Sequence, residues 1–169
     1  MNSSVSTEDR TNEQFLKVLL AFRGVAETRR NRTFMEVSGY PHYENVSSNI
    51  LKFYLDPTAE HGLNNLLLSS FFRMAGVAEV PIASKVSIET RQATDLGNSI
   101  DLVINSDAFT IGIENKIYHW LANDLEDYGR FIDKLAAKKP TVIKAVLGLH
   151  AIRDKGALSG GFVSFTYSQ

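Results

Sequence analysis

The sequence predicts an α/β domain in which helices cover a mixed β-sheet of about four to five strands. Two features of the sequence carry this prediction. Apolar residues recur at three- and four-residue spacing through the first half of the chain, but they alternate every second residue from Lys85 onward. In addition, the almost continuously apolar segment at 141–150 is typical of a central strand that is buried on both faces.

Helices are predicted in the first half of the chain. Residues 1–11 are polar and aperiodic, so we expect a flexible tail there and a single domain over 12–169. Apolar residues from Phe15 onward indicate a first helix. Prolines at 41 and 57 interrupt the pattern, because the residue before a proline is pushed out of the helical region. Two further helices are therefore expected, at 44–55 and at 61–76.

Strands are predicted in the second half of the chain. Alternating patterns indicate three consecutive strands, and the short connection at Ser106-Asp107 is typical of a hairpin. A polar helix, a strand, a loop and a last strand should follow. The expected strands lie at 85–92, 99–105, 109–118, 141–150 and 161–168, and the expected helix lies at 121–138.

Composition excludes several classes of protein. The 169 residues include no cysteine, which excludes disulfides, a thiolate zinc site and a cysteine nucleophile. No apolar segment is long enough to cross a membrane and the N-terminal segment does not resemble a secretory signal, so we expect a cytoplasmic protein. A formal net charge of −1 argues against a generally basic surface but leaves room for local basic clusters. Such clusters occur at Arg29, Arg30 and Arg32 and at Lys134, Lys138 and Lys139.

Three charged residues on neighbouring predicted strands are the candidate site. Asp101 interrupts an apolar strand, and a buried charge needs a partner. Glu114 and Lys116 are two residues apart on the next strand, so their side chains leave the same face. A tight turn between the strands makes Asp101 and Glu114 plausible neighbours.

Two interpretations of this cluster stay open from the residue types. Adjacent carboxylates repel, and a divalent cation between them would remove that penalty. Oxygen ligands without histidine or cysteine favour Mg²⁺ or Mn²⁺. Lys116 could then position a water molecule or offset charge on a phosphate that is being attacked. Alternatively, a buried Asp–Lys or Glu–Lys pair merely links two strands.

Asp101 followed by Glu114-x-Lys116 on the next strand resembles the short signature of the PD-(D/E)XK nuclease superfamily. Upstream segments make the resemblance more specific, because they are similar to a bacterial and phage branch of that superfamily. The resemblance covers about residues 34–150 and implies a restriction-endonuclease-like core with additional N-terminal helices. The matching segments are Tyr43-Glu44-Asn45, Ser48-Asn49-Ile50-Leu51, Leu55-Asp56-Pro57, His61-Gly62-Leu63 and Ile113-Glu114-Asn115-Lys116.

The resemblance implies roles for these residues. Asp101, Glu114 and the main-chain carbonyl of Asn115 would hold Mg²⁺ or Mn²⁺, and Lys116 would be the catalytic lysine. Glu44 would be an additional acidic residue for the metal or its water, although a carboxylate at this place also suits a helix N-terminus. Members often carry a glutamine in the helix after Glu-x-Lys, where this chain has Asn123-Asp124-Leu125.

Three more residues are candidate substrate contacts: His119 just beyond the lysine, and Asp124 with Tyr128 on one helix face. Each also has a structural explanation, as an exposed strand end or a solvated helix face. The leading hypothesis is a Mg²⁺-dependent endonuclease that acts on DNA. The alternatives are an inactive nuclease-fold module of phage or defence systems that binds protein or nucleic acid, and a hydrolase of small nucleotides. The sequence leaves the oligomeric state open, a dimer included.

Overall fold

The computed structural model describes residues 17, 44–81, 83–117, 121–152 and 154–169. The chain divides into two compact units, residues 1–41 and 42–169, and the fold described below belongs to the second. The predicted tail, the helix expected from Phe15 apart from Lys17, the arginine cluster and His119 lie outside the described residues. None of the helices in the described part of the chain is both long and apolar enough to span a membrane.

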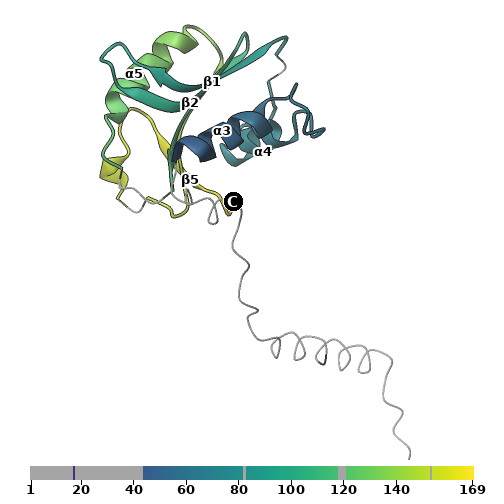
Figure 1. Ribbon diagram of the computed structural model, residues 1–169. Coiled ribbons are helices and arrows are strands. Elements are labelled where there is room, and N and C mark those ends of the chain that lie inside the picture. The colour runs from purple at the N-terminus through teal and green to yellow at the C-terminus, as the bar shows by residue number, and fades with distance from the viewer. Residues whose placement is uncertain (1–16, 18–43, 82, 118–120, 153) are drawn as a thin grey trace, which may run out of the picture. The chain divides into compact units, whose positions relative to one another are not determined.

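The centre of the second unit is a mixed sheet whose five described strands lie side by side in sequence order. Figure 1 shows this sheet with its helices. The first three strands form an antiparallel meander, and the last two continue the sheet in parallel. The parallel step from β3 to β4 requires a crossover, which a helix supplies. The strands are β1 (Val86–Ala93), β2 (Ser99–Ser106), β3 (Phe109–Lys116), β4 (Thr141–Gly148) and β5 (Val163–Thr166).

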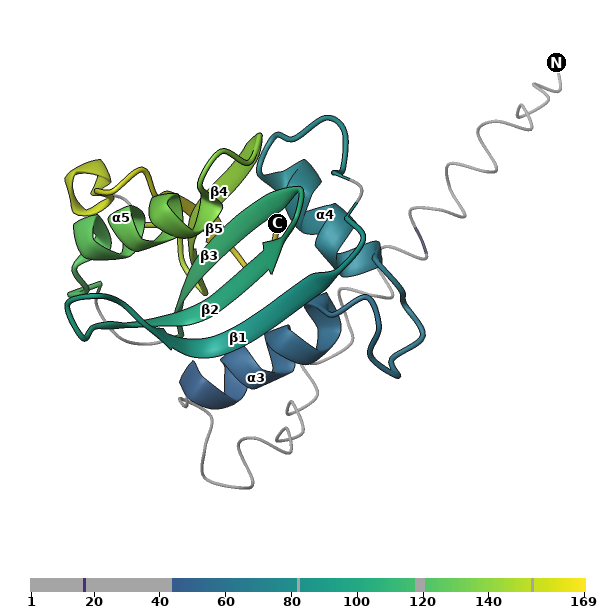
Figure 2. The ribbon, with the colours of Figure 1, turned by 90° about the horizontal axis from the view of Figure 1, so that it is seen from above.

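Helices cover both faces of this sheet. The helices α3 (Glu44–Leu55) and α4 (Leu66–Met74) lie on one side, and α5 (Leu125–Ala136) lies on the other, as Figure 2 shows. A short 3-10 turn, η1 (Lys155–Ala157), precedes the last strand. The predicted mixed sheet flanked by helices is confirmed.

Alternation along the strands separates two cores. Ile111 and Ile113 of β3 belong to the core beneath α3 and α4, which also contains Phe72. The core beneath α5 contains Val103, Ile132 and Val146. Residues 109–115 of β3 are all buried, as expected for a central strand with a helix layer on each side.

Two helices begin a few residues later than predicted. The helix expected from residue 61 begins at Leu66, because Gly62 and Asn64 have φ angles of 72° and 50°. His61 instead stabilises the turn: its Nδ1 accepts the N–H of Leu63, and its Nε2 lies 2.9 Å from the carbonyl oxygen of Asp56. The helix expected from residue 121 begins at Leu125, because the carboxylate of Asp124 caps it by accepting the N–H of Asp127.

A close backbone contact sets the position of α5 at its glycine. A methyl group at Gly129 would lie 2.5 Å from the carbonyl oxygen of Gly160, which is backbone and cannot swing aside. We expect Gly129→Ala to reduce the free energy of unfolding by about 1–3 kcal/mol, the usual cost of overpacking, although alanine is the better helix former. Urea unfolding measures the change.

The matched control for this prediction is Gly156→Ala. The nearest atom to its added methyl group is the carboxylate oxygen of Asp154, at 3.1 Å, which belongs to an exposed side chain. A Gly129→Ala protein as stable as the wild type would show that α5 can shift without loss.

Candidate active site

Asp101 lies where β2 and β3 stop pairing. The antiparallel ladder runs as far as Leu102 opposite Ile113, and Asp101 and Glu114 come next on the two strands. The Asp101 carboxylate accepts the backbone N–H of Asn115 at 2.8 Å. The Asp101 carboxylate therefore replaces a backbone carbonyl as acceptor for β3 where the β2–β3 pairing ends. This hydrogen bond holds the carboxylate beside Glu114.

Lys116 lies between two carboxylates. Its Nζ is 2.8 Å from Oε1 of Glu114 and 3.4 Å from Oε2 of Glu44. Glu114 is 1% exposed, whereas the Lys116 side chain keeps 13% of its surface accessible. The carboxylate of Glu114 thus lies at the buried side of the cluster, and the ammonium group of Lys116 lies nearer to solvent.

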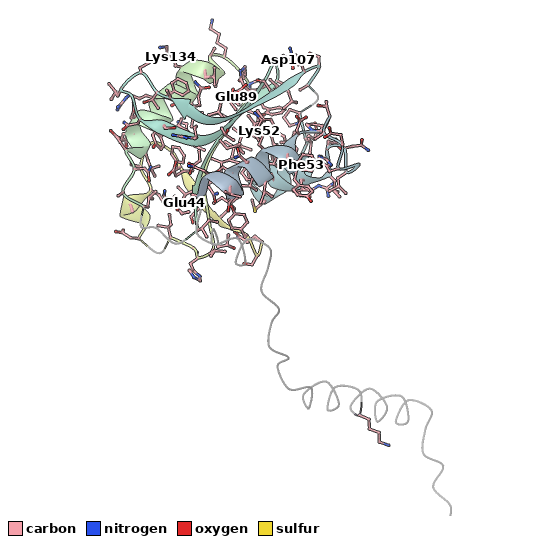
Figure 3. The ribbon with its side chains drawn as sticks, viewed as in Figure 1. Glu44, Lys52, Phe53, Glu89, Asp107 and Lys134 are labelled. Carbon is pink, nitrogen blue, oxygen red and sulfur yellow. The ribbon has the colours of Figure 1, made fainter. Side chains whose placement is uncertain are left out.

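Glu44 reaches this cluster from the first turn of α3, where Figure 3 labels it. Its carboxylate accepts the backbone N–H of Ile117 at 3.3 Å in addition to the contact with Lys116. A carboxylate is favourable at a helix N-terminus because of the partial positive charge there. The structure therefore brings together Glu44, Asp101, Glu114 and Lys116, which the sequence places on three separate elements.

Burial and mutual repulsion shift the protonation of these groups. Burial, followed by the charge of Asp101, raises the pKa of Glu114 to about 7. Burial also raises the pKa of Asp101, although the N–H of Asn115 and the charge of Lys116 oppose the effect. Burial lowers the pKa of Lys116, but the hydrogen bond to Glu114 and the three carboxylates outweigh it, so its pKa lies above the usual value.

The donor set suits a hard divalent cation. Oε2 of Glu114 is buried and, among the described residues, has no hydrogen-bond partner, which is costly for a carboxylate oxygen. As arranged, no set of three or more His, Asp or Glu side chains in the described part of the chain forms a ready cation cage. Lys116 supplies the positive charge that Glu114 and Glu44 share in this arrangement. An unsatisfied carboxylate oxygen beside two further carboxylates is the chemistry that Mg²⁺ and Mn²⁺ prefer.

The buried charge predicts a cost in stability at Glu114. Its pKa is 4.5 unfolded and about 7 folded, so the wild type should lose stability as the pH rises through this window. In EDTA at pH 8 we expect Glu114→Gln to raise the free energy of unfolding by about 1–3 kcal/mol. Below pH 4.5 the two proteins should be equally stable. Urea unfolding across this pH range measures the difference. A variant less stable than the wild type at pH 8 would show that ionised Glu114 does not destabilise the fold.

The side chain of Asn115 belongs to a buried network on the opposite face of β3. Its Nδ2 donates to the carbonyl oxygen of Glu44 at 3.3 Å and to Oγ of Ser48 at 3.2 Å. The hydroxyl of Tyr167 donates to its Oδ1 at 2.6 Å. This network ties the start of α3 to the end of β3 and so positions the Glu44 carboxylate. Ser48 lies in one of the segments that resemble the nuclease branch, but no role was predicted for it from the sequence. Tyr167 was not predicted at all, and its only signal was a tyrosine at the end of the last strand.

The other candidate contacts lie around the N-terminus of α5. Asp124 is exposed, and its carboxylate caps the helix by accepting the N–H of Asp127 rather than joining the carboxylate cluster. Tyr128 is buried, and its hydroxyl donates to the carbonyl oxygen of Ser99 at 2.8 Å, two residues before Asp101. The charges of Glu114 and Asp101 contribute, after burial, to raising the pKa of Tyr128, which places its hydroxyl within the field of the site.

Asp127 is a further buried polar residue for which the sequence predicted no role. It is 3% exposed, and its Oδ2 accepts hydrogen bonds from Thr94 at 2.5 Å and from Asn98 at 2.8 Å. These two donors, Thr94 first, lower the pKa of Asp127. The carboxylate thereby holds the β1–β2 turn against α5, which fixes the helix that carries Tyr128.

Comparison with known proteins agrees with this arrangement. The family model described as the PD-(D/E)XK nuclease superfamily matches residues 33–160. No curated protein and no solved structure matches the chain significantly. The matched range covers more than half of the chain and includes all four charged residues of the cluster, which α3, β2 and β3 carry. The chain therefore belongs to the PD-(D/E)XK nuclease superfamily.

Proposed function

We propose that the protein is a nuclease that uses Mg²⁺ or Mn²⁺ to hydrolyse phosphodiester bonds, with DNA as its substrate. The observation that carries the proposal is the convergence of Glu44, Asp101 and Glu114 around Lys116, with one buried oxygen of Glu114 unsatisfied among the described residues. Membership in a superfamily of nucleases supports the reaction class.

Asp101, Glu114 and the main-chain carbonyl of Asn115 are the proposed metal ligands, with Glu44 for the ion or its water. When bound, the ion polarises the phosphodiester and lowers the pKa of a water molecule. The chain prepares the ligands in two ways. The N–H of Asn115 holds the Asp101 carboxylate, and the buried network around Asn115 holds the start of α3.

Lys116 is the proposed catalytic lysine. Because its pKa lies above the usual value, its amine is protonated at neutral pH and acts as a cation rather than as a base. Water attack forms a P–O bond while the bond to the leaving oxygen breaks, and negative charge grows on the phosphoryl oxygens. Phosphoryl transfer depends mostly on positioning and on stabilisation of the developing charge. The ammonium group of Lys116, beside the carboxylates, stabilises that charge.

The experiment that tests this function is a cleavage assay on supercoiled plasmid DNA with Mg²⁺, with Mn²⁺ and with EDTA. Nicked or linear product in either metal, and none in EDTA, is the expected result. Linear duplex DNA, single-stranded DNA, RNA and free nucleotides run in parallel. Cleavage of RNA or nucleotides without cleavage of DNA would overturn the substrate, and no cleavage of any of them would overturn the proposal.

A second candidate function is a nuclease-fold module that binds protein or nucleic acid without cutting. The observation that favours it is the contact of Lys116 with both Glu114 and Glu44, which neutralises part of the acidic cluster. Metal binding separates the two candidates, because only the nuclease needs a cation at these carboxylates.

A further inference from the structure

Arg91 has an unfavourable backbone conformation in the middle of a strand. Its φ angle is 56°, although it lies within β1. The other non-glycine residues with positive φ in the described part of the chain are Asn64, in a turn, and Ala137, at the C-terminal cap of α5. A residue with a Cβ atom rarely adopts this region, and such outliers concentrate at functional sites.

The distortion lies directly opposite the candidate metal ligand on β2. Thr90 pairs with Leu102 and Gln92 pairs with Ile100, so Arg91 faces Asp101 without an inserted residue. Ile100 packs in the core under α5, whereas Leu102, two residues on, packs in the core under α3 and α4. The alternation of side chains along β2 therefore breaks at Asp101. Arg91 and Asp101 lie at the same local distortion of the sheet.

No structural contact of the arginine compensates this conformation. Arg91 is exposed, and its side chain forms no hydrogen bond or ion pair with the residues that the structure describes. The Asp101 carboxylate is engaged instead with the N–H of Asn115. The charge of Arg91 still helps to lower the pKa of Asp101, as the weakest of the influences on that group, so the guanidinium lies within electrostatic reach of the site.

We infer that Arg91 is a substrate-binding residue whose guanidinium contacts a backbone phosphate of the nucleic acid beside the site formed by Asp101, Glu114 and Lys116. This inference rests on the proposed function, because it needs a phosphodiester there. A guanidinium offers a planar set of donors that matches a phosphate in two parallel hydrogen bonds. A strained, exposed and uncompensated arginine at the rim of an acidic cluster attracts the polyanion that the carboxylates alone would repel.

The test is Arg91→Gly, which removes the side chain and also relieves the strained backbone. Binding of a fluorescent DNA duplex is measured by anisotropy in Ca²⁺, which takes the same oxygen ligands. We expect the affinity to fall about tenfold, the loss of one charged hydrogen-bonding contact. The slope of log affinity against log salt should fall by about one, and the melting temperature should rise or stay unchanged.

Two variants control for the backbone and the charge. Ala137→Gly relieves the same kind of strain at φ 51° outside the site, and it should leave binding unchanged. Arg91→Lys keeps the charge but loses the paired donors, so it should keep the salt slope while binding more weakly.

Two results would overturn the inference. One is wild-type affinity and salt slope in Arg91→Gly. The other is a lower melting temperature of Arg91→Gly together with rescue of binding at lower temperature, which would show a structural role. Failure of the proposed function gives a different result. DNA binding would then still depend on Arg91, but the wild type would cut no DNA in Mg²⁺ or Mn²⁺.

Discussion

Replacing Lys116 with methionine is expected to reduce the rate of DNA cleavage by about 10²–10³-fold or more, the usual cost of removing a group that stabilises transition-state charge. Methionine keeps most of the length of the side chain but removes the ammonium group that contacts Glu114 and Glu44. Single-turnover cleavage of a plasmid at saturating Mg²⁺ measures the effect on the chemical step.

Metal binding separates a catalytic role of Lys116 from a structural one. Without the ammonium group the carboxylates are less neutralised, so the affinity of Lys116→Met for Mn²⁺ should equal or exceed that of the wild type. The matched control is Lys134→Met. It removes the ammonium group of an exposed lysine of α5, whose Nζ lies 2.7 Å from the carboxylate of Asp95. Cleavage by Lys116→Met at the wild-type rate would exclude the assigned role.

Replacing Asp101 with asparagine is expected to weaken Mn²⁺ binding by more than about 100-fold. Changes to residues that merely support metal ligands cost 10- to 100-fold, and loss of a ligand carboxylate should cost more. The asparagine keeps an oxygen that can accept the N–H of Asn115, so the end of β3 should stay in place. Isothermal titration with Mn²⁺ measures the affinity, and circular dichroism checks the fold.

The control for this variant is Asp107→Asn, which makes the same change of charge in an exposed turn where Asp107 accepts hydrogen bonds from Ser84. Equal Mn²⁺ affinity in the Asp101 variant and the wild type would remove Asp101 from the ligand set. Absence of binding heat in the wild type would instead favour the non-catalytic module.

Much of the fold was predictable because its signals are local. The helix at 44–55 was predicted to the residue, and the strand at 109–118 was wrong only at its C-terminal end, since β3 ends at Lys116. The error at residues 61–65 has a local cause as well, because apolar periodicity does not report the positive φ angles of Gly62 and Asn64.

The candidate site was partly predictable for a similar reason. Alternation along a strand fixes that Glu114 and Lys116 share a face, and a short hairpin brings Asp101 near them. The roles of these residues stay predictions, which metal titration and DNA cleavage test. Ser48, Asp127 and Tyr167 could not be found in this way, because each forms a side-chain hydrogen bond to a residue 29 to 67 positions away in the chain.

The sequence by itself determined the α/β class, the order of the elements and the membership in a nuclease superfamily, since these follow from periodicity and short motifs. Only the tertiary structure decided how α3 delivers Glu44 to Lys116, which oxygen of Glu114 is left buried without a partner, and where β1 is strained at Arg91. Such features depend on the distances between elements and on a single backbone angle. No pattern of residue types along one chain specifies these quantities, because they arise when separate elements pack together.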